Sequence, residues 1–104
     1  MTDEIVFQQG NIVVRRLRLL PGDAMQWHRD AFNRIAVVLS GDVLSIEYRD
    51  GGESHRVSIK PGQVDWEGPS ARVHRAVNIG EQVYEQVTVF LLDRPDAVAQ
   101  PSEA

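Results

Sequence analysis

Histidine and carboxylate side chains are the residues of this sequence whose chemistry could support binding or catalysis. His28 and Asp30 are separated by one residue, Gln26 precedes them at the same spacing, and His74 lies far along the chain. Residues two apart on a β-strand point to the same side, so Gln26, His28 and Asp30 share one face if a strand continues that far. The sequence contains no cysteine, so any bound metal must be held by histidine, carboxylate or amide groups.

The overall composition is that of one globular domain. The 104 residues are 42% hydrophobic and 25% charged, which suits a single core and argues against disorder. The formal net charge of −4 would repel a polyphosphate backbone, so nucleic acid is not expected as a partner. No apolar run approaches the roughly 18 residues of a membrane span, and the chain begins with the acidic run MTDE. These features predict a cytoplasmic protein that does not enter a membrane.

Hydrophobic periodicity predicts an all-β protein. Short β-branched and aliphatic runs alternate with turn residues, and no stretch of about 12 residues shows a helical repeat. Nine strands are expected, at residues 5–8, 12–20, 24–29, 34–40, 43–48, 54–59, 63–66, 73–78 and 82–92. Such short strands must close their sheet edges, as sandwiches, jelly rolls and small barrels do.

The end of the chain differs in composition from the rest. Residues 94–104 contain two prolines, Pro95 and Pro101, and little hydrophobicity. We therefore expect a single domain over residues 1–93 and a flexible tail over residues 94–104.

The spacing within residues 22–41 resembles the first sequence motif of the cupin family. That motif runs Gly, five residues, His, one residue, His, three or four residues, Glu, six residues, Gly. Gly22, His28, Asp30, Arg34 and Gly41 occupy these positions here, so Asp30 replaces the second His and Arg34 replaces the Glu. Two of the three ligand identities in this motif are changed.

Residues 62–78 resemble the second cupin motif, which runs Gly, five residues, Pro, one residue, Gly, two residues, His, three residues, Asn. One extra residue precedes Pro69 and Ala71 replaces the second Gly, but His74 and Asn78 fall on their expected positions. The chain is thus similar to small single-domain cupins of the RmlC-like jelly-roll family, with a degenerate metal motif. This resemblance implies a cupin-type double-stranded β-helix, a jelly-roll barrel of about nine short strands.

In a cupin barrel, the ligand face of the first motif is the interior, where the histidine of the second motif reaches the same point. The resemblance therefore implies a divalent metal, Fe, Mn, Zn or Ni, held by His28, Asp30 and His74. A barrel that holds no metal is the alternative. Two imidazoles and one carboxylate also match the composition of the facial triad of non-haem iron oxygenases. Gln26 is expected to line the interior and contact a ligand.

Arg34 is the main objection to a metal, because a guanidinium offers positive charge and no acceptor. Facing inward, it would pair with Asp30 as a buried ion pair or clamp a carboxylate or phosphate of a small ligand. A local bulge would instead turn it to solvent. Arg16 and Arg18 share one parity of their strand, and they either face outward or join Arg34 around an anionic ligand.

Three functions remain open on these residues. The first is a metal-dependent enzyme of isomerase, lyase or dioxygenase type, acting on a small organic acid or sugar-type metabolite inside the barrel. The second is a metal-free module that binds or senses an anionic metabolite through Arg34. The third is a purely structural dimeric domain whose barrel is filled.

A homodimer is expected, since cupins of this size commonly pair. Residues 5–7, Ile-Val-Phe, could add a strand to a neighbour's sheet and cover an open edge. Trp27 and Trp66 are expected to anchor the core. His55 is expected to be solvated near a hairpin end, and Asn78 to tie a turn together through its amide.

Overall fold

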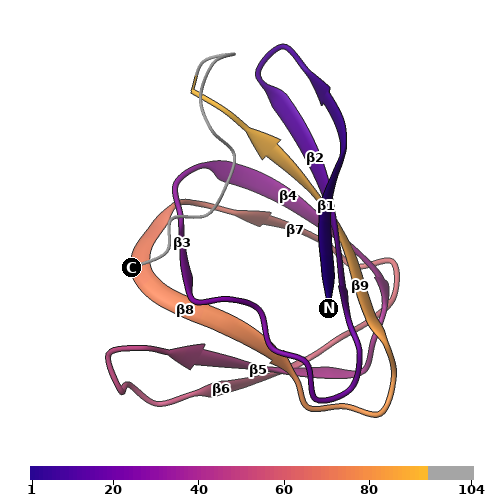
Figure 1. Cartoon of the computed structure of the whole chain (residues 1–104), viewed down its shortest axis with the longest axis vertical. Helices are drawn as coiled ribbons and strands as arrows, with labels where there is room; N and C mark the ends of the chain where they lie inside the picture. Colours follow the sequence, from indigo (N-terminus) through magenta and orange to yellow (C-terminus); the bar gives the residue numbers. More distant parts are fainter. Residues whose placement is uncertain (94–104) are drawn as a thin grey trace.

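The computed structural model describes residues 1–93, which form two antiparallel sheets without any helix (Figure 1). The nine strands are β1 (Thr2–Gln9), β2 (Ile12–Leu19), β3 (His28–Asp30), β4 (Asn33–Ser40), β5 (Val43–Tyr48), β6 (His55–Ser58), β7 (Val64–Glu67), β8 (Ser70–Asn78) and β9 (Tyr84–Leu91). The five-stranded sheet has the order β1-β2-β9-β4-β7 and the four-stranded sheet the order β3-β8-β5-β6. The predicted all-β class and the nine strands are confirmed.

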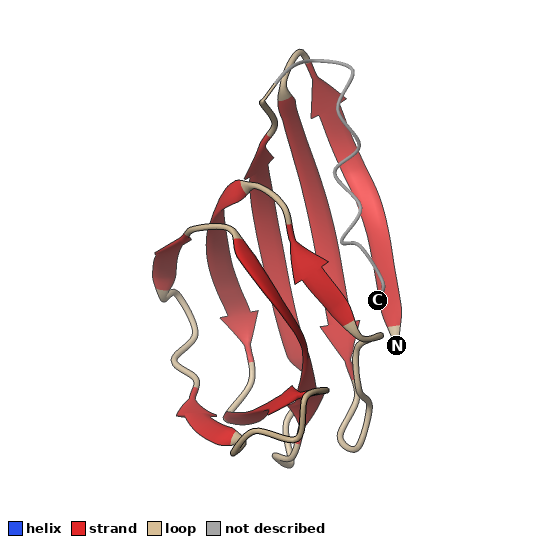
Figure 2. Cartoon of the chain, turned by 90° about the vertical axis from the view of Figure 1, so that its left-hand side faces the viewer, coloured by secondary structure: helices blue, strands red, loops and turns tan. Residues whose placement is uncertain are grey.

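The two sheets face each other around an interior, with β1 at one outer edge (Figures 1 and 2). In the part of the chain that the structure describes, no helix is long and apolar enough to cross a membrane. The tail predicted at residues 94–104 lies outside the described residues.

The third strand differs most from its prediction. The strand expected at residues 24–29 is reduced to β3, and Ala24 forms only an isolated bridge with Val77. The pairing of β3 with β8 shifts register between His28 and Asp30. Regular alternation therefore does not extend back to Gln26.

Apolar side chains fill one end of the interior. The larger cluster is formed by Leu17, Leu19, Val38, Leu44, Ala76 and Tyr84. Leu19 of β2 pairs with Tyr84 of β9, so this cluster lies at that end of the two strands. A smaller cluster around Val13 and Phe90 lies at the other end. Complete burial of one such side chain contributes roughly 1.5–3 kcal/mol.

Gly41 turns the chain from β4 into β5 and so joins the two sheets. Its φ of +133° lies outside the range that residues with a side chain favour. A Cβ at this position would also lie 2.8 Å from Cδ1 of Tyr84 and 3.3 Å from a methyl group of Ile59. Both the backbone conformation and the close packing therefore require glycine at the last position of the first motif.

Candidate functional site

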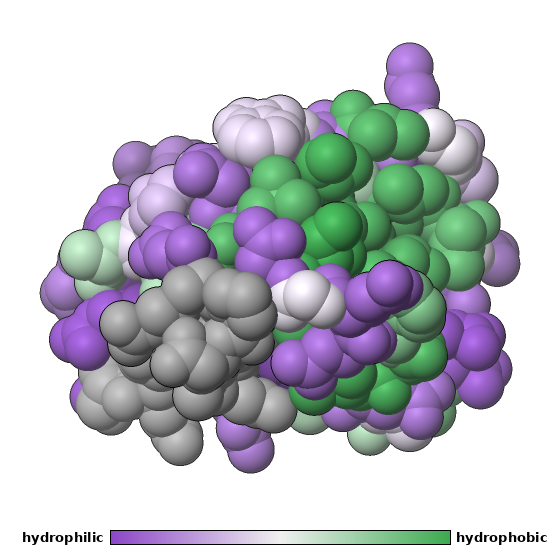
Figure 3. Space-filling model, turned by 90° about the horizontal axis from the view of Figure 1, so that it is seen from above, coloured by the Kyte–Doolittle hydropathy of each residue, from purple (hydrophilic) through white to green (hydrophobic). Residues whose placement is uncertain are grey.

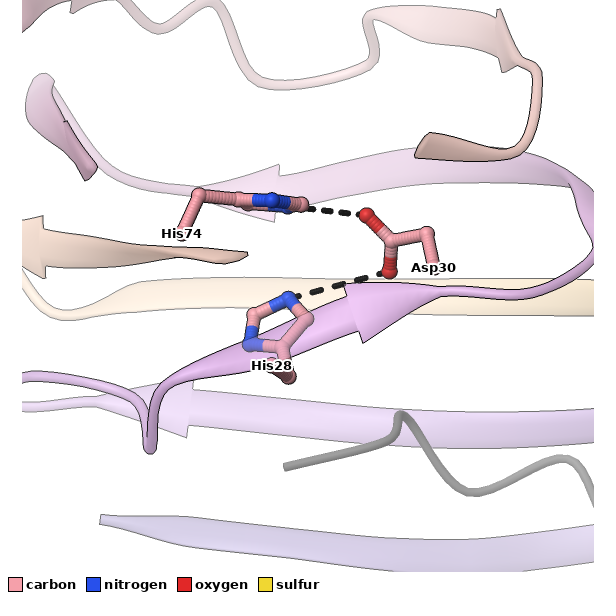
Figure 4. A group of neighbouring side chains, drawn as sticks. All are labelled: His28, Asp30 and His74. Carbon is pink, nitrogen blue, oxygen red and sulfur yellow. Dashed lines mark ion pairs between the residues drawn. The ribbon is translucent and has the colours of Figure 1, made fainter. Parts of the chain in front are cut away.

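β3 and β8 bring the two motif segments together inside the barrel. His28 pairs with His74 across the ladder, and their ring centroids are 4.6 Å apart. The carboxylate of Asp30 faces both rings from one side, with Oδ1 3.7 Å from Nε2 of His28 and Oδ2 2.8 Å from Nε2 of His74 (Figure 4). The candidate ligand atoms of the three residues all lie within 4.8 Å of one another. The residues implied as metal ligands therefore converge, and metal binding by them stays a prediction.

Main-chain carbonyls fix the orientation of both imidazole rings. Nδ1–H of His28 donates to the carbonyl oxygen of Gln26 at 2.8 Å, and Nδ1–H of His74 donates to that of Arg72 at 2.7 Å. A carbonyl oxygen only accepts, so Nδ1 carries the proton in each ring. Each Nε2 atom is consequently directed at Asp30.

The electrostatics of the site depend on the buried carboxylate of Asp30. Burial acts to raise the pKa of Asp30, but the hydrogen bond from His74 and the positive charge of Arg34 outweigh it and lower that pKa below its usual value. The same hydrogen bond raises the pKa of His74 against the opposing effect of burial. The ion pair between Asp30 and a protonated His74 is therefore favoured.

Arg34 faces the interior, and its side chain is only 12% exposed. Nη2 lies 3.0 Å from Oδ2 of Asp30 and 2.5 Å from Oε2 of Glu67, and Nη1 donates to the carbonyl oxygen of Gly68. The ion pair with Asp30 is the arrangement observed, and the outward bulge does not occur. Glu67 was not found from the sequence, because it is opposed to Arg34 only through the β4–β7 ladder.

The interior contains a cavity of about 220 Å³. Its apolar walls include members of the larger core cluster, such as Leu17, Val38 and Leu44. The polar and ionisable lining residues are Asp3, Arg15, His28, Asp30, Arg34, Gln63, Asp65, Glu67, His74, Tyr84, Gln86 and Thr88. Pockets for drug-sized ligands measure roughly 300–1,000 Å³, so this cavity suits a smaller molecule.

The five-stranded sheet contributes polar groups that sequence reasoning missed. Nε2 of Gln86 donates to Oγ1 of Thr88 at 2.7 Å, and the hydroxyl of Tyr84 donates to Oε1 of Gln86. Nε2 of Gln63, just before β7, donates to Oδ2 of Asp65 on β7 at 2.8 Å. These side chains face the two histidines from the opposite sheet, and the cavity is polar on both sides.

One expectation about the polar residues is wrong, and the outward alternative given for another pair is confirmed. The side chain of Gln26 is exposed and does not line the cavity, because β3 begins only at His28. Arg16 and Arg18 face outward and pair with Glu85, at 3.0 and 3.6 Å. The inward arginine of β2 is Arg15, which is buried and lies 3.0 Å from Asp3.

Of the remaining predictions about single residues, the structure contradicts one and confirms others. Trp66 is exposed rather than buried in the core, and Trp27 is half-buried beneath the guanidinium of Arg75. His55 is exposed, as predicted. Asn78 is buried; its amide donates to the carbonyls of residues 19 and 82 and accepts from the N–H of residue 80, which confirms its predicted role.

No protein-family model and no curated protein matches the sequence. Solved structures do match the fold. A cupin domain from Bordetella pertussis Tohama I has a TM-score of 0.76 at 18% identity, over 86% of this chain and 91% of that one. A double-stranded β-helix protein from Klebsiella pneumoniae has a TM-score of 0.69 at 20% identity, over 99% of this chain and 84% of that one.

A third similar structure is that of an enzyme. The polyketide cyclase RemF from Streptomyces resistomycificus has a TM-score of 0.64 at 18% identity, over 89% of this chain and 66% of that one. Structural matches at identities this low show a shared fold and do not establish a shared activity. The chain thus has the cupin-type double-stranded β-helix fold that its two motif segments imply.

Proposed function

We propose that this protein binds a small organic acid or sugar-type metabolite inside its barrel, together with a divalent metal ion held by His28, Asp30 and His74. One observation carries the proposal: both histidines direct Nε2 at the same carboxylate while main-chain carbonyls hold their Nδ1–H groups. Donation from Nδ1–H orients an imidazole and raises the basicity of Nε2, as is usual for metal-binding histidines.

The donor set fits a first-row divalent metal. Two imidazoles and one carboxylate suit Fe, Mn, Zn or Ni, and no thiolate is needed. A metal ion would replace the proton on Nε2 of His74, and Arg34 would keep Glu67 as a carboxylate partner. When bound, such an ion supplies Lewis-acid polarisation of a ligand oxygen. An isomerase, lyase or dioxygenase reaction could each use that chemistry.

The test is metal stoichiometry on protein purified without a histidine tag. Wild type is equilibrated separately with Mn, Fe(II), Zn and Ni near neutral pH, dialysed and measured by elemental analysis. We expect close to one ion per chain for at least one metal, and its loss in His28→Ala and His74→Ala. His55→Ala is the matched control, because His55 is exposed on β6. Wild type without stoichiometric metal, or alanine variants that bind as wild type does, would overturn the proposal.

Arg34 supports a second candidate function, binding of an organic anion without metal. Its guanidinium faces the cavity and contacts Glu67, whose side chain is 47% exposed and could give way to a ligand carboxylate. Small carboxylates and sugar phosphates should then raise the melting temperature with a chelator present, since a ligand selective for the folded state stabilises it. The shift should disappear in Arg34→Gln. If no anion stabilises the chelated protein, this candidate fails.

A further inference from the structure

The carboxylate of Asp30 is shared between the candidate metal site and Arg34. Oδ2 of Asp30 lies 2.8 Å from Nε2 of His74 and 3.0 Å from Nη2 of Arg34, so one oxygen faces both an imidazole and a guanidinium. The side chains of Asp30 and Arg34 are 5% and 12% exposed, which leaves little water to screen their charges. A divalent ion at this carboxylate and the guanidinium would therefore compete for the same negative charge.

Arg34 has other partners in the cavity wall besides Asp30. Its Nη2 lies 2.5 Å from Oε2 of Glu67, and its Nη1 donates to the carbonyl oxygen of Gly68 at 3.3 Å. A guanidinium carries five N–H donors in one plane. Loss of the contact with Asp30 would therefore leave the guanidinium held at the cavity, with a donor available for a ligand.

The net charge around Arg34 depends on what is bound at Asp30. Ionised Asp30, Arg34 and Glu67 together carry one net negative charge, and Asp65 adds another to the cavity wall. These charges oppose the entry of an organic anion. A divalent ion beside Asp30 would offset both negative charges, and an anion would then be bound more favourably.

We propose that a divalent metal and a short organic monocarboxylate bind cooperatively in this cavity, and that Arg34 couples the two. The inference rests on the metal site proposed above. With an ion at Asp30, the planar fork of Arg34 can bind a ligand carboxylate through two parallel N–H···O bonds. Linkage requires the reverse effect as well, because an anion that holds Arg34 away from Asp30 leaves that carboxylate more available to the ion.

The cavity wall beside Arg34 suits the apolar part of such a ligand. Phe90 is opposite Arg34 on the β4–β9 ladder, and Ala36 is the next inward residue of β4. Both line the cavity, whose volume of about 220 Å³ matches a chain of a few carbon atoms. The substrate class inferred is therefore a short monocarboxylate with an apolar chain.

Arginines on the outer surface provide a contrast with Arg34. The side chains of Arg16 and Arg18 are 47% and 51% exposed, and both lie beside Glu85. Figure 3 shows that hydrophilic side chains on the face it displays surround a broad hydrophobic area and are open to solvent. Water and salt screen such exposed charges, so these arginines should not bind a monocarboxylate measurably.

The test is isothermal titration calorimetry with butyrate as the probe. Protein loaded with Mn, Fe(II), Zn or Ni, whichever ion it retains best, is compared with protein stripped by a chelator and dialysed. We expect butyrate to bind about tenfold more tightly to the loaded protein, and the ion to bind about tenfold more tightly in saturating butyrate, which is within the usual range of coupling between sites. Butyramide, which has a similar shape and no charge, should not depend on the ion.

Three variants show whether Arg34 carries the coupling. Arg34→Gln should bind the ion at least as tightly as wild type, because a competing positive charge is removed, and butyrate should no longer affect ion binding. Glu67→Gln removes the carboxylate that competes with the ligand, so the loaded variant should bind butyrate more tightly than wild type. Arg16→Gln is the matched control on the same sheet and should behave as wild type does.

The outcomes separate this inference from the proposed function. Wild type that holds no ion would overturn both. Ion binding that is unaffected by butyrate would overturn the inference alone, and so would equal coupling in wild type and Arg34→Gln. If circular dichroism shows that Arg34→Gln does not fold, Glu67→Gln decides, and butyrate binding no tighter than in wild type would overturn the inference.

Discussion

The inner and outer faces of the five-stranded sheet have reversed chemistry in the middle of the strands. One inner row consists of Ile5, Arg15, Thr88, Ala36 and Asp65. The neighbouring row on the outer face has no polar side chain; this outer row consists of Phe7, Val14, Val89, Ile35 and Trp66. Antiparallel sheets usually place apolar residues inside and polar residues outside. The contrast shows that the middle of this sheet places its polar groups toward the cavity and its apolar side chains toward the outside, opposite to the usual arrangement.

The reversal does not extend to the whole inner face. At the end where Leu19 meets Tyr84, the interior is a conventional apolar cluster. We infer that this end supplies most of the folding free energy and allows the middle of the sheet to be polar. Substitutions on the two faces can separate these contributions.

The largest effect is expected for Leu19→Ala, because Leu19 is completely buried in the larger cluster. Truncation of a buried leucine costs about 2–5 kcal/mol of unfolding free energy. Val64→Ala on the outer face should cost less than about 0.5 kcal/mol in the isolated chain. Urea denaturation of both variants checks this difference, and equal losses would contradict the contrast between the faces.

Asp30→Asn should have the next largest effect. Removing one partner of a buried ion pair costs about 3–5 kcal/mol, and we expect the lower end because Arg34 retains Glu67. Glu67→Gln is the control, since its half-exposed carboxylate should contribute no more than about 1 kcal/mol. Chemical denaturation without metal measures both. An Asp30→Asn variant as stable as wild type would show that the interior does not depend on this charge.

A smaller effect on the unfolding free energy is expected from making a polar residue of β9 apolar and its apolar neighbour polar. Thr88→Val removes the acceptor of the Gln86 side chain and should cost about 1 kcal/mol of unfolding free energy. Val89→Thr, at a partly exposed position of the outer row, should cost less than about 0.5 kcal/mol. Chemical denaturation of both variants measures the two losses of unfolding free energy. Identical behaviour of the two variants would remove the distinction between the faces.

The smallest effect on stability is expected in the turn between β4 and β5, which joins the two sheets. Asp42 accepts from the backbone N–H groups of Glu81 and Val43, and the first of these bonds is the main reason that its pKa is lowered. A lowered native pKa stabilises the fold above the unfolded value near 4, and this contribution is lost as the pH falls through the native value. Asp42→Asn should therefore melt below wild type at neutral pH, with the difference shrinking in acid. Melting curves across this range test it, and a constant difference would argue against the ionised form.

Much of the fold and part of the site could be predicted from the sequence. Turn residues delimited the strands, and the spacing of His28, Asp30 and His74 within two motif segments anticipated their convergence. Partners across a ladder could not be predicted, because which strands are neighbours is a property of the folded sheet. Glu67 reaches Arg34 in this way.

The direction of an alternating pattern was also not predictable. Residues 64–67, Val-Asp-Trp-Glu, alternate clearly, but the apolar parity faces outward and the acidic parity lines the cavity. On β2 both parities contain arginine, so Arg15 could not be distinguished from Arg16. The two-residue period of a strand is local, whereas the side that faces the interior depends on what the other sheet covers.

The carbonyl bonds that orient the two histidines have a practical consequence. In both cases the acceptor belongs to the residue two positions earlier in the chain, at Gln26 and Arg72. The ring direction is set by the backbone path, so it does not require a particular side chain at either position. The side chains at positions 26 and 72 could therefore be randomised in a library without changing the orientation of either imidazole.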